Sequence, residues 1–404
     1  MSMVLLLGQE VGHPGSLSPR HAGNPEPIPG SIRHKAGYTL DKASLKEQTV
    51  ENGSVKECNR VECQLHVLSF LSEVDKCNSA LVCSSWSCLV RSGKLWRVAD
   101  YSRRGVFRLG QEGLLVSNRE FERWKSWVHH YTHHLISRGA SLLTLKASFD
   151  LGDQCNKWGE LLSHLLENVH CRDLSHLDLN WTFTLLEPLD LRVHSGSSSH
   201  QDVISKMDQV NNFQILLAKL AQSCPRITKM RLHFDWSDKS VALIAQFQHL
   251  RILELKYFWV FKGVSPSTLQ ALTKSLPNLK SLTLNVLVPL RNLGISYILE
   301  SLSLEFLDVS LSRGLVFSSL KLPALRELRA KKIVRGITLD RRTRIRIQSR
   351  WPCLYQVLRD GTPKLQVLNN ERLLPNWKEQ TYDELTSILQ QSCYCLQHLD
   401  NWIW

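Results

Sequence analysis

The sequence lacks several features that would each assign a function class. It has no apolar run of the roughly 20 residues needed to cross a bilayer, and its first apolar stretch has neither a preceding basic residue nor a clear cleavage site. It also lacks glycine-rich nucleotide loops, the G-x-S-x-G nucleophile elbow and paired C-x-x-C metal ligands. We therefore expect no membrane span, no secretory signal, no nucleotide-binding or hydrolase site, and no structural zinc site.

Composition indicates a globular chain of the cytoplasm or nucleus. Its eleven cysteines are an odd number and stand mostly in apolar segments, which predicts buried free thiols and a reducing compartment. The same prediction covers Cys83, Cys88, Cys393 and Cys395. The formal net charge of +13 favours acidic partners but says nothing about the fold.

The texture of the chain changes near Cys58. Residues 1–57 are rich in Gly, Pro and Ser, and we predict that they form a disordered tail because they have too few apolar residues to bury. Residues 58–100 contain short apolar clusters joined by polar turns, which predicts three short helices. Residues 101–140 connect these to the rest and contain one long helix, with a capping box at Ser117 and Glu120 and a glycine stop at Gly139.

The connecting helix contains four histidines. His129/His133 and His130/His134 have a spacing that can bind zinc on a helix. They lie away from the apolar stripe of the same helix, so we favour a solvated face and predict neither a metal nor a cofactor. The stripe consists of Phe121, Trp124, Val128, Tyr131 and Leu135.

Beyond residue 141 the pattern L-x-x-L-x-L recurs, with helical apolar spacing between several copies. It predicts an α/β leucine-rich-repeat solenoid over 141–404, with parallel strands on the concave side and helices on the convex side. We place a Ser-rich insert near 182–212, as a protruding loop. The predicted strands are marked by Leu142/Leu145, Leu174/Leu177/Leu179, Ile227/Met230/Leu232, Leu250/Leu253/Leu255, Leu279/Leu282/Leu284, Leu304/Leu307/Val309, Leu325/Leu328, Leu365/Leu368 and Leu396/Leu399.

The apolar order of residues 58–100 resembles an F-box. The residues that carry this resemblance are Glu62, Val67-Leu68-Ser69-Phe70-Leu71, Ala80-Leu81-Val82-Cys83, Trp86 and Leu95-Trp96-Arg97. With repeats downstream, the chain resembles the F-box proteins with leucine-rich repeats.

This resemblance implies a non-enzymatic substrate-recognition subunit of an SCF-type ubiquitin ligase. The F-box would bind the small adaptor and, through it, the cullin, while the repeats would bind an unknown protein substrate. A buried helical cap on the repeats is the simpler interpretation of the same residues. Adaptor contact is predicted for Val67, Leu68, Phe70, Leu71, Leu81, Val82, Trp86, Leu95 and Trp96. Some of these residues must instead hold the three helices together, and the sequence does not divide the two roles.

Two other functions remain open. A ligase-independent repeat scaffold would follow if Asn59-Arg60, which stands where the family has Leu-Pro, weakens adaptor binding. Residues 329–350 are strongly basic and have three interpretations: a solvated face, a site for an acidic or phosphorylated substrate, or a nuclear-import or nucleic-acid patch. No aromatic residues alternate with the basic ones, which disfavours nucleic acid. The substrate-site interpretation involves Arg341, Arg342, Arg344, Arg346 and Arg350.

Overall fold

The computed structural model divides the chain into two units, Met1–Glu57 and Cys58–Trp404. It describes residues 60–101, 115–116, 118–150, 157–182, 185–186, 198–257, 263–288, 295–312, 314–330 and 354–380, all within the second unit. The predicted tail, the ninth predicted strand at Leu396/Leu399 and the capping box at Ser117 lie outside the described residues.

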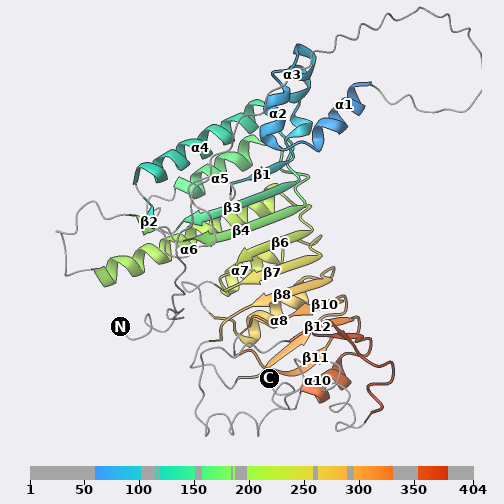
Figure 1. Cartoon of the computed structure of the whole chain (residues 1–404). Coiled ribbons are helices and arrows are strands. Elements are labelled where there is room, and N and C mark those ends of the chain that lie inside the picture. Colours follow the sequence, from blue (N-terminus) through green and yellow to red (C-terminus); the bar gives the residue numbers. More distant parts are fainter. Residues whose placement is uncertain are drawn as a thin grey trace, which may run out of the picture. The chain divides into compact units, whose positions relative to one another are not determined.

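The described residues form a mixed α/β structure (Figure 1). The helices are α1 (Arg60–Ser69), α2 (Glu73–Ser79), α3 (Ser84–Val90), the 3-10 turn η1 (Gly93–Leu95), α4 (Asn118–Ser137), α5 (Lys157–Asn168), α6 (Ser198–Ser223), α7 (Asp238–Ile244), α8 (Pro266–Ser275) and α10 (Leu354–Gly361). The strands are β1 (Val98–Asp100), β2 (Leu115–Val116), β3 (Thr144–Asp150), β4 (His176–Thr182), β5 (Leu185–Leu186), β6 (Lys229–His233), β7 (Ile252–Lys256), β8 (Ser281–Asn285), β9 (Tyr297–Glu300), β10 (Phe306–Asp308), β11 (Phe317–Lys321), β12 (Glu327–Arg329), β13 (Val367–Leu368) and β14 (Glu371–Arg372).

Ten of these strands form one sheet in the order β1-β3-β4-β6-β7-β8-β10-β12-β13-β14. Each strand pairs in parallel with the next one in this order, except that β13 and β14 pair antiparallel. Eight of the nine predicted strands lie in this sheet, as β3, β4, β6, β7, β8, β10, β12 and β13. The sheet therefore extends by one strand with each copy of the sequence pattern.

One backbone contact recurs where these strands begin. The carbonyl of the residue before a strand accepts two N–H groups from the next strand in the sheet: Arg97 accepts from Leu143 at 2.7 Å and from Thr144 at 3.1 Å. This pairing fixes the register of each strand on its neighbour and satisfies the backbone at the sheet edge. The same double acceptance occurs at the carbonyls of Leu143, Ser175, Thr228, Arg251, Lys280, Glu305 and Arg326.

The core lies on one face of the sheet, because alternate residues of a strand point to opposite faces. The inward positions are leucines or similar residues aligned by the register, and they are at most 2% exposed. One such row runs across the sheet through Leu145, Leu177, Met230, Leu253, Leu282, Leu307, Leu328 and Leu368.

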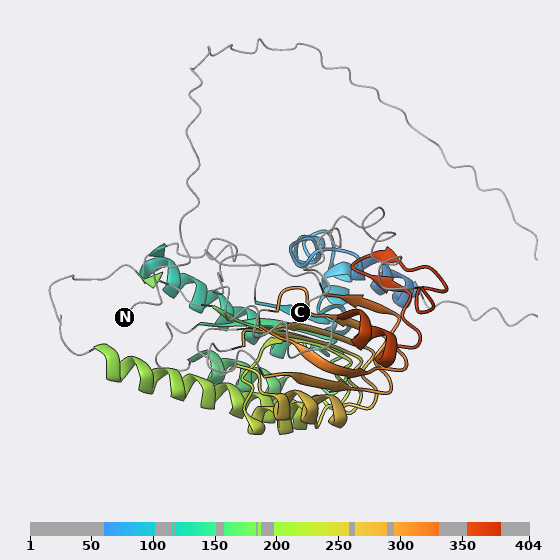
Figure 2. The same cartoon turned by 90° about the horizontal axis from the view of Figure 1, so that it is seen from below.

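Helices cover this face over only part of the sheet. Consecutive helices from α5 to α8 pack against one another, and the green to yellow helices α6–α8 lie together on one side of the sheet (Figure 2). Between β8 and β12 the chain instead forms the parallel pair β9 and β11. Helices throughout the second layer were predicted, which is wrong here: Tyr297 and Leu299 are buried while Ile298 and Glu300 are not, an alternation that only a strand satisfies.

The long connecting helix ends as its sequence predicts. Gly139 adopts a φ of +57°, the N–H of Gly139 bonds the carbonyl of Ile136, and the N–H of Ala140 bonds that of Leu135. These two bonds form a Schellman motif, which stops α4. The Ser-rich insert differs from its prediction, because α6 begins at Ser198 and residues 198–212 are helical rather than a loop. No helix among the described residues combines the length and apolar character needed to cross a membrane.

Candidate functional site

Helices α1 to α3 and η1 form a small module that precedes the sheet (Figure 1). Side-chain caps start two of its helices: the Ser72 hydroxyl accepts the N–H of Asp75 at 3.2 Å, and the Cys83 sulfur accepts the N–H of Trp86 at 3.5 Å. The module continues directly into β1, whose residues Val98–Asp100 pair with β3. It therefore supplies the first strand of the sheet.

The structure separates the nine residues predicted to contact an adaptor. Five are exposed, one is half-buried and three are buried at 2–4% exposure. The prediction of direct adaptor contact is wrong for the three buried residues, because their side chains form part of the core. The exposed residues are Val67, Phe70, Leu81, Val82 and Trp86, the half-buried one is Leu71, and the buried ones are Leu68, Leu95 and Trp96.

Trp96 holds the module together. It is 2% exposed, and its indole N–H donates to the carbonyl of Val90 at 2.9 Å. The Lys76 ammonium lies 5.8 Å from the Trp96 ring centre and donates to the carbonyl of Leu95 at 3.0 Å. Burial lowers the pKa of Lys76, and Glu73 opposes this shift. Contacts from α2 and α3 thus meet at one indole.

Helix α4 packs against the module. The Tyr131 hydroxyl donates to Glu73 of α2 and to the carbonyl of Val98 at 3.2 Å. Burial, followed by the hydrogen bond to Glu73, raises the pKa of Tyr131. His134 meets Trp96 edge-on, with ring centres 4.5 Å apart. His134 was predicted to face solvent with the other three histidines, which is wrong, because it is half-buried on this indole.

A glycine permits the close approach between η1 and the end of α4. A Cβ atom on Gly93 would lie 2.2 Å from the carbonyl oxygen of Gly139 and 2.7 Å from that of Arg138. No side chain fits there, so the module and α4 are held backbone to backbone. The buried residues of the module therefore belong to the same core as those of the sheet.

The module also exposes an unusual amount of apolar surface. Among the described residues fifteen large apolar side chains are exposed, and seven of them lie between residues 61 and 86. Leu81 is 85% exposed and Phe70 is 75% exposed. Clustered exposure of this kind marks surfaces that bind other proteins. We refer to Val67, Phe70, Leu81, Val82 and Trp86 as the exposed apolar set.

The cysteines of the module have exposed thiols, so the prediction of buried cysteines is wrong for them. Cys63, Cys77, Cys83 and Cys88 are exposed, and only Cys171 and Cys224 are buried among the described cysteines. In the part of the chain that the structure describes, no three His, Cys, Asp or Glu side chains gather as metal ligands would.

The face of the sheet opposite the core carries charged side chains in one row. Register places Asp100, Lys146, Asp178, Arg231 and Glu254 side by side on successive strands. Their signs alternate: Lys146 lies 3.8 Å from Asp100, and Arg231 lies 3.6 Å from Asp178 and 2.7 Å from Glu254. The row has three carboxylates and two cations, and the ammonium of Lys256 lies 3.9 Å from Glu254 as a third cation.

A histidine lies next to this row on β6. His233 pairs in register with Lys256 of β7. Burial and then the ammonium of Lys256 lower the pKa of His233 to about 4. Both effects disfavour the protonated ring, so His233 is neutral at physiological pH.

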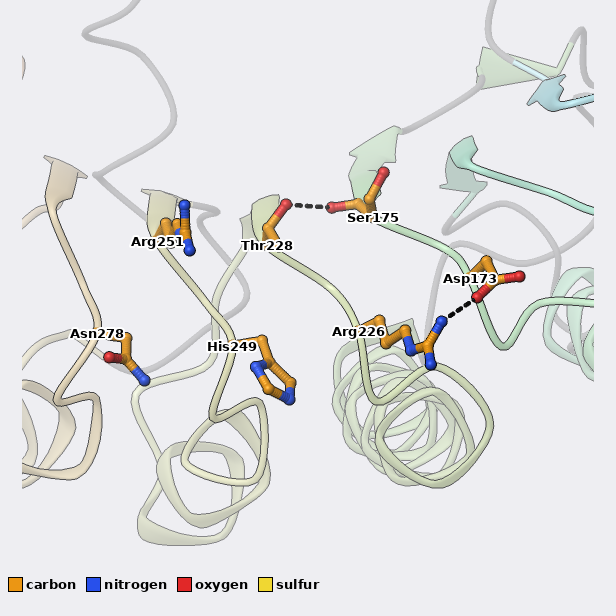
Figure 3. A pocket seen from close by; sticks show the side chains of 7 residues that line it. All are labelled: Asp173, Ser175, Arg226, Thr228, His249, Arg251 and Asn278. Atoms are coloured by element: carbon orange, nitrogen blue, oxygen red, sulfur yellow. Dashed lines mark hydrogen bonds and ion pairs between the residues drawn. The ribbon is translucent and has the colours of Figure 1, made fainter. Parts of the chain in front are cut away.

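A groove runs along the edge of the sheet where the strands begin. Its volume is about 630 Å³, and Figure 3 shows the seven side chains that line it. They are Asp173, Ser175, Arg226, Thr228, His249, Arg251 and Asn278. This groove could not be predicted from the sequence, because its residues share a position before each strand but no chemistry. The predicted basic site at Arg341, Arg342, Arg344, Arg346 and Arg350 lies outside the described residues.

Comparison with known proteins agrees with the geometry of the module. Residues 61–101 match the F-box-like family. This match covers α2, α3, η1, β1 and nearly all of α1, and it ends at Tyr101, which is buried and whose hydroxyl lies 3.0 Å from that of Thr132 on α4. No curated protein matches the chain. The class defined here is a chain with an F-box-like domain joined to a large, mostly parallel sheet.

Proposed function

We propose that the chain is the substrate-recognition subunit of an SCF-type ubiquitin ligase. The observation that carries the proposal is the exposed apolar set on the F-box-like domain. These side chains are held outward by a core of Leu68, Leu95 and Trp96, so burying them against a partner requires no unfolding. Each large apolar side chain that becomes fully buried contributes about 1.5–3 kcal/mol. The partner is the small adaptor, which joins the chain to the cullin.

The sheet and its helices are proposed to be a degenerate leucine-rich-repeat solenoid that binds the substrate. The recurring double hydrogen bond at each strand start and the aligned leucine rows support this assignment. In such an array each unit stacks only on its neighbours, which creates a long surface of repeated positions. Substrate specificity then lies in side chains that differ between units.

In this proposal the chain performs no bond chemistry. Holding a substrate near a charged ubiquitin-conjugating enzyme turns a bimolecular encounter into one of high effective concentration. A reducing compartment, cytoplasm or nucleus, is proposed for the chain. The exposed thiols on the F-box-like domain support this location, because free exposed thiols oxidise elsewhere.

A pair of matched variants tests the proposal. Leu81→Lys changes an 85% exposed residue of the exposed apolar set, and Leu302→Lys changes an 86% exposed residue that precedes β10. Both should keep the melting temperature, because neither side chain is buried. Capture of purified adaptor and cullin should fall at least tenfold for Leu81→Lys and stay unchanged for Leu302→Lys.

Two results would count against the proposal. Equal capture by wild type and Leu81→Lys would remove the exposed apolar set from the interface. No capture by the wild-type chain would favour the ligase-independent scaffold, in which Asn59-Arg60 replaces the usual Leu-Pro.

A further inference from the structure

The groove at the strand-start edge has the composition of a binding site rather than of ordinary turns. Its residues occupy two positions that repeat from unit to unit: Asp173, Arg226, His249 and Asn278 each lie two residues before Ser175, Thr228, Arg251 and Lys280. Successive strands of a sheet are about 4.8 Å apart. The groove from β4 to β8 therefore spans about 14 Å, the length of roughly four extended peptide residues.

The floor of the groove offers acceptors. The Thr228 hydroxyl donates to the carbonyl of Ser175 at 3.2 Å (Figure 3). The Ser175 hydroxyl lies 3.1 Å from the carbonyl oxygen of Leu143 and 2.8 Å from Nδ1 of His176, so it is satisfied within the protein. Because the Thr228 hydroxyl hydrogen points into the protein, the lone pairs of its oxygen remain for a ligand. Asn278 likewise donates its amide N–H to the carbonyl of Gln248 at 2.9 Å, which leaves its amide oxygen. These oxygen atoms would accept hydrogen bonds from the main-chain N–H groups of a peptide.

The two arginines of the groove differ in whether their charge is paired within the protein. Arg226 forms an ion pair with Asp173 at 2.6 Å, so it is neutralised within the protein (Figure 3). Arg251 and His249 are both exposed, and neither has a side-chain partner among the described residues. A guanidinium presents several N–H donors in a fork that matches a carboxylate or phosphate. The unsatisfied donors therefore lie at the β7 unit, beside the acceptors of the floor.

We propose that this groove binds an extended peptide that carries one oxyanion, held by Arg251 and His249 while the floor accepts main-chain N–H groups. The oxyanion is a carboxylate or a phosphate ester, since both suit a guanidinium. A peptide fits better than a nucleic acid, because the described lining has one arginine without an ion-pair partner, which serves one anion rather than a track of phosphates. Among the described residues, no phenylalanine, tyrosine or tryptophan lines the groove for stacking on bases.

Binding itself depends only on the groove. The peptide's role as a ubiquitination substrate rests on the proposed function. The two are separable, because changes at Arg251 should leave adaptor capture intact and Leu81→Lys should leave peptide binding intact.

The test uses the purified full-length chain on three immobilised peptide libraries. The libraries have degenerate uncharged flanks and a central serine, phosphoserine or glutamate. Wild type should be retained at least tenfold more on the phosphoserine or the glutamate library than on the serine library, and the stronger of the two identifies the source of the oxyanion. Equal retention on all three would overturn the proposal.

Variants locate the interaction. Arg251→Gln and His249→Gln should each reduce binding to the anionic library, about tenfold for the arginine, because a charge-assisted hydrogen bond contributes about 1.5–3 kcal/mol. Asp173→Asn should strengthen binding severalfold by releasing Arg226, a gain that misfolding cannot produce. Arg359→Gln, a change of an exposed arginine on α10, is the matched control and should have no effect.

Two outcomes would refute the assignment. If the Arg251→Gln variant binds the anionic library as tightly as wild type does, the anion is bound elsewhere than at Arg251. A single-stranded RNA homopolymer that binds more tightly than every peptide, and loses that binding with Arg251→Gln, would assign the groove to nucleic acid.

Discussion

Two tryptophans that stand ten positions apart should behave differently when truncated. Trp96 is 2% exposed and Trp86 is 37% exposed. Trp96→Ala removes the ring that contacts His134 and Lys76 and leaves the Val90 carbonyl without its indole donor. Truncating a buried tryptophan costs about 3–5 kcal/mol.

Trp86→Ala should cost less, about 1–2 kcal/mol, because much of its ring is already in water. Urea titration followed by far-ultraviolet circular dichroism measures both free energies of unfolding. Adaptor capture by the still folded Trp86→Ala chain should nevertheless be lost, since the proposed function places this ring in the interface. Equal destabilisation by the two substitutions, or unchanged capture by Trp86→Ala, would refute the division between core and exposed apolar set.

Two further predictions follow from backbone packing and from a buried imidazole. Gly93→Ala should destabilise the chain by about 1–3 kcal/mol in thermal unfolding, because its Cβ would lie 2.2 Å from the Gly139 carbonyl oxygen; Gly139→Ala, which meets no atom but must keep a φ of +57°, should cost about 1 kcal/mol. His233 has a folded pKa of about 4, against about 6.5 when unfolded, so the unfolded chain binds more protons in this window. Stability is complete above pH 6.5 and should fall by up to roughly 3 kcal/mol as the pH drops to 4. His233→Gln should remove that slope in urea titrations across this range, and a flat wild-type profile would contradict the buried neutral imidazole.

The strands of the sheet were predictable because their signal is repeated and physical. Leu253 and Leu255 must both point inward, so only a strand after the turn at Leu250 satisfies the pattern. The strand β9 was missed although Tyr297 and Leu299 alternate with exposed neighbours, because four residues give too short a pattern to separate it from a helix. Gly139 and its αL turn were predictable because few other residues adopt that conformation.

The site was less predictable than the fold. Leu68 and Phe70 are both apolar and stand two positions apart, yet one is 3% exposed and the other is 75% exposed. Composition cannot assign these roles, because the face that each residue takes depends on how α1 packs against α3 and η1. The groove could not be predicted from the sequence for a related reason. Arg251 and Asp173 come into line only through strand pairing across distant parts of the sequence.

The strand β1 has a practical consequence for dissecting the chain. A fragment that starts after residue 101 would lose not only the F-box-like domain but also the strand that pairs with Thr144, Leu145 and Lys146. Those three residues would become an open template for strand addition by other molecules. Deletion of the F-box-like domain should therefore yield an aggregation-prone protein, whereas Leu81→Lys changes an exposed side chain of that domain and leaves β1 in place.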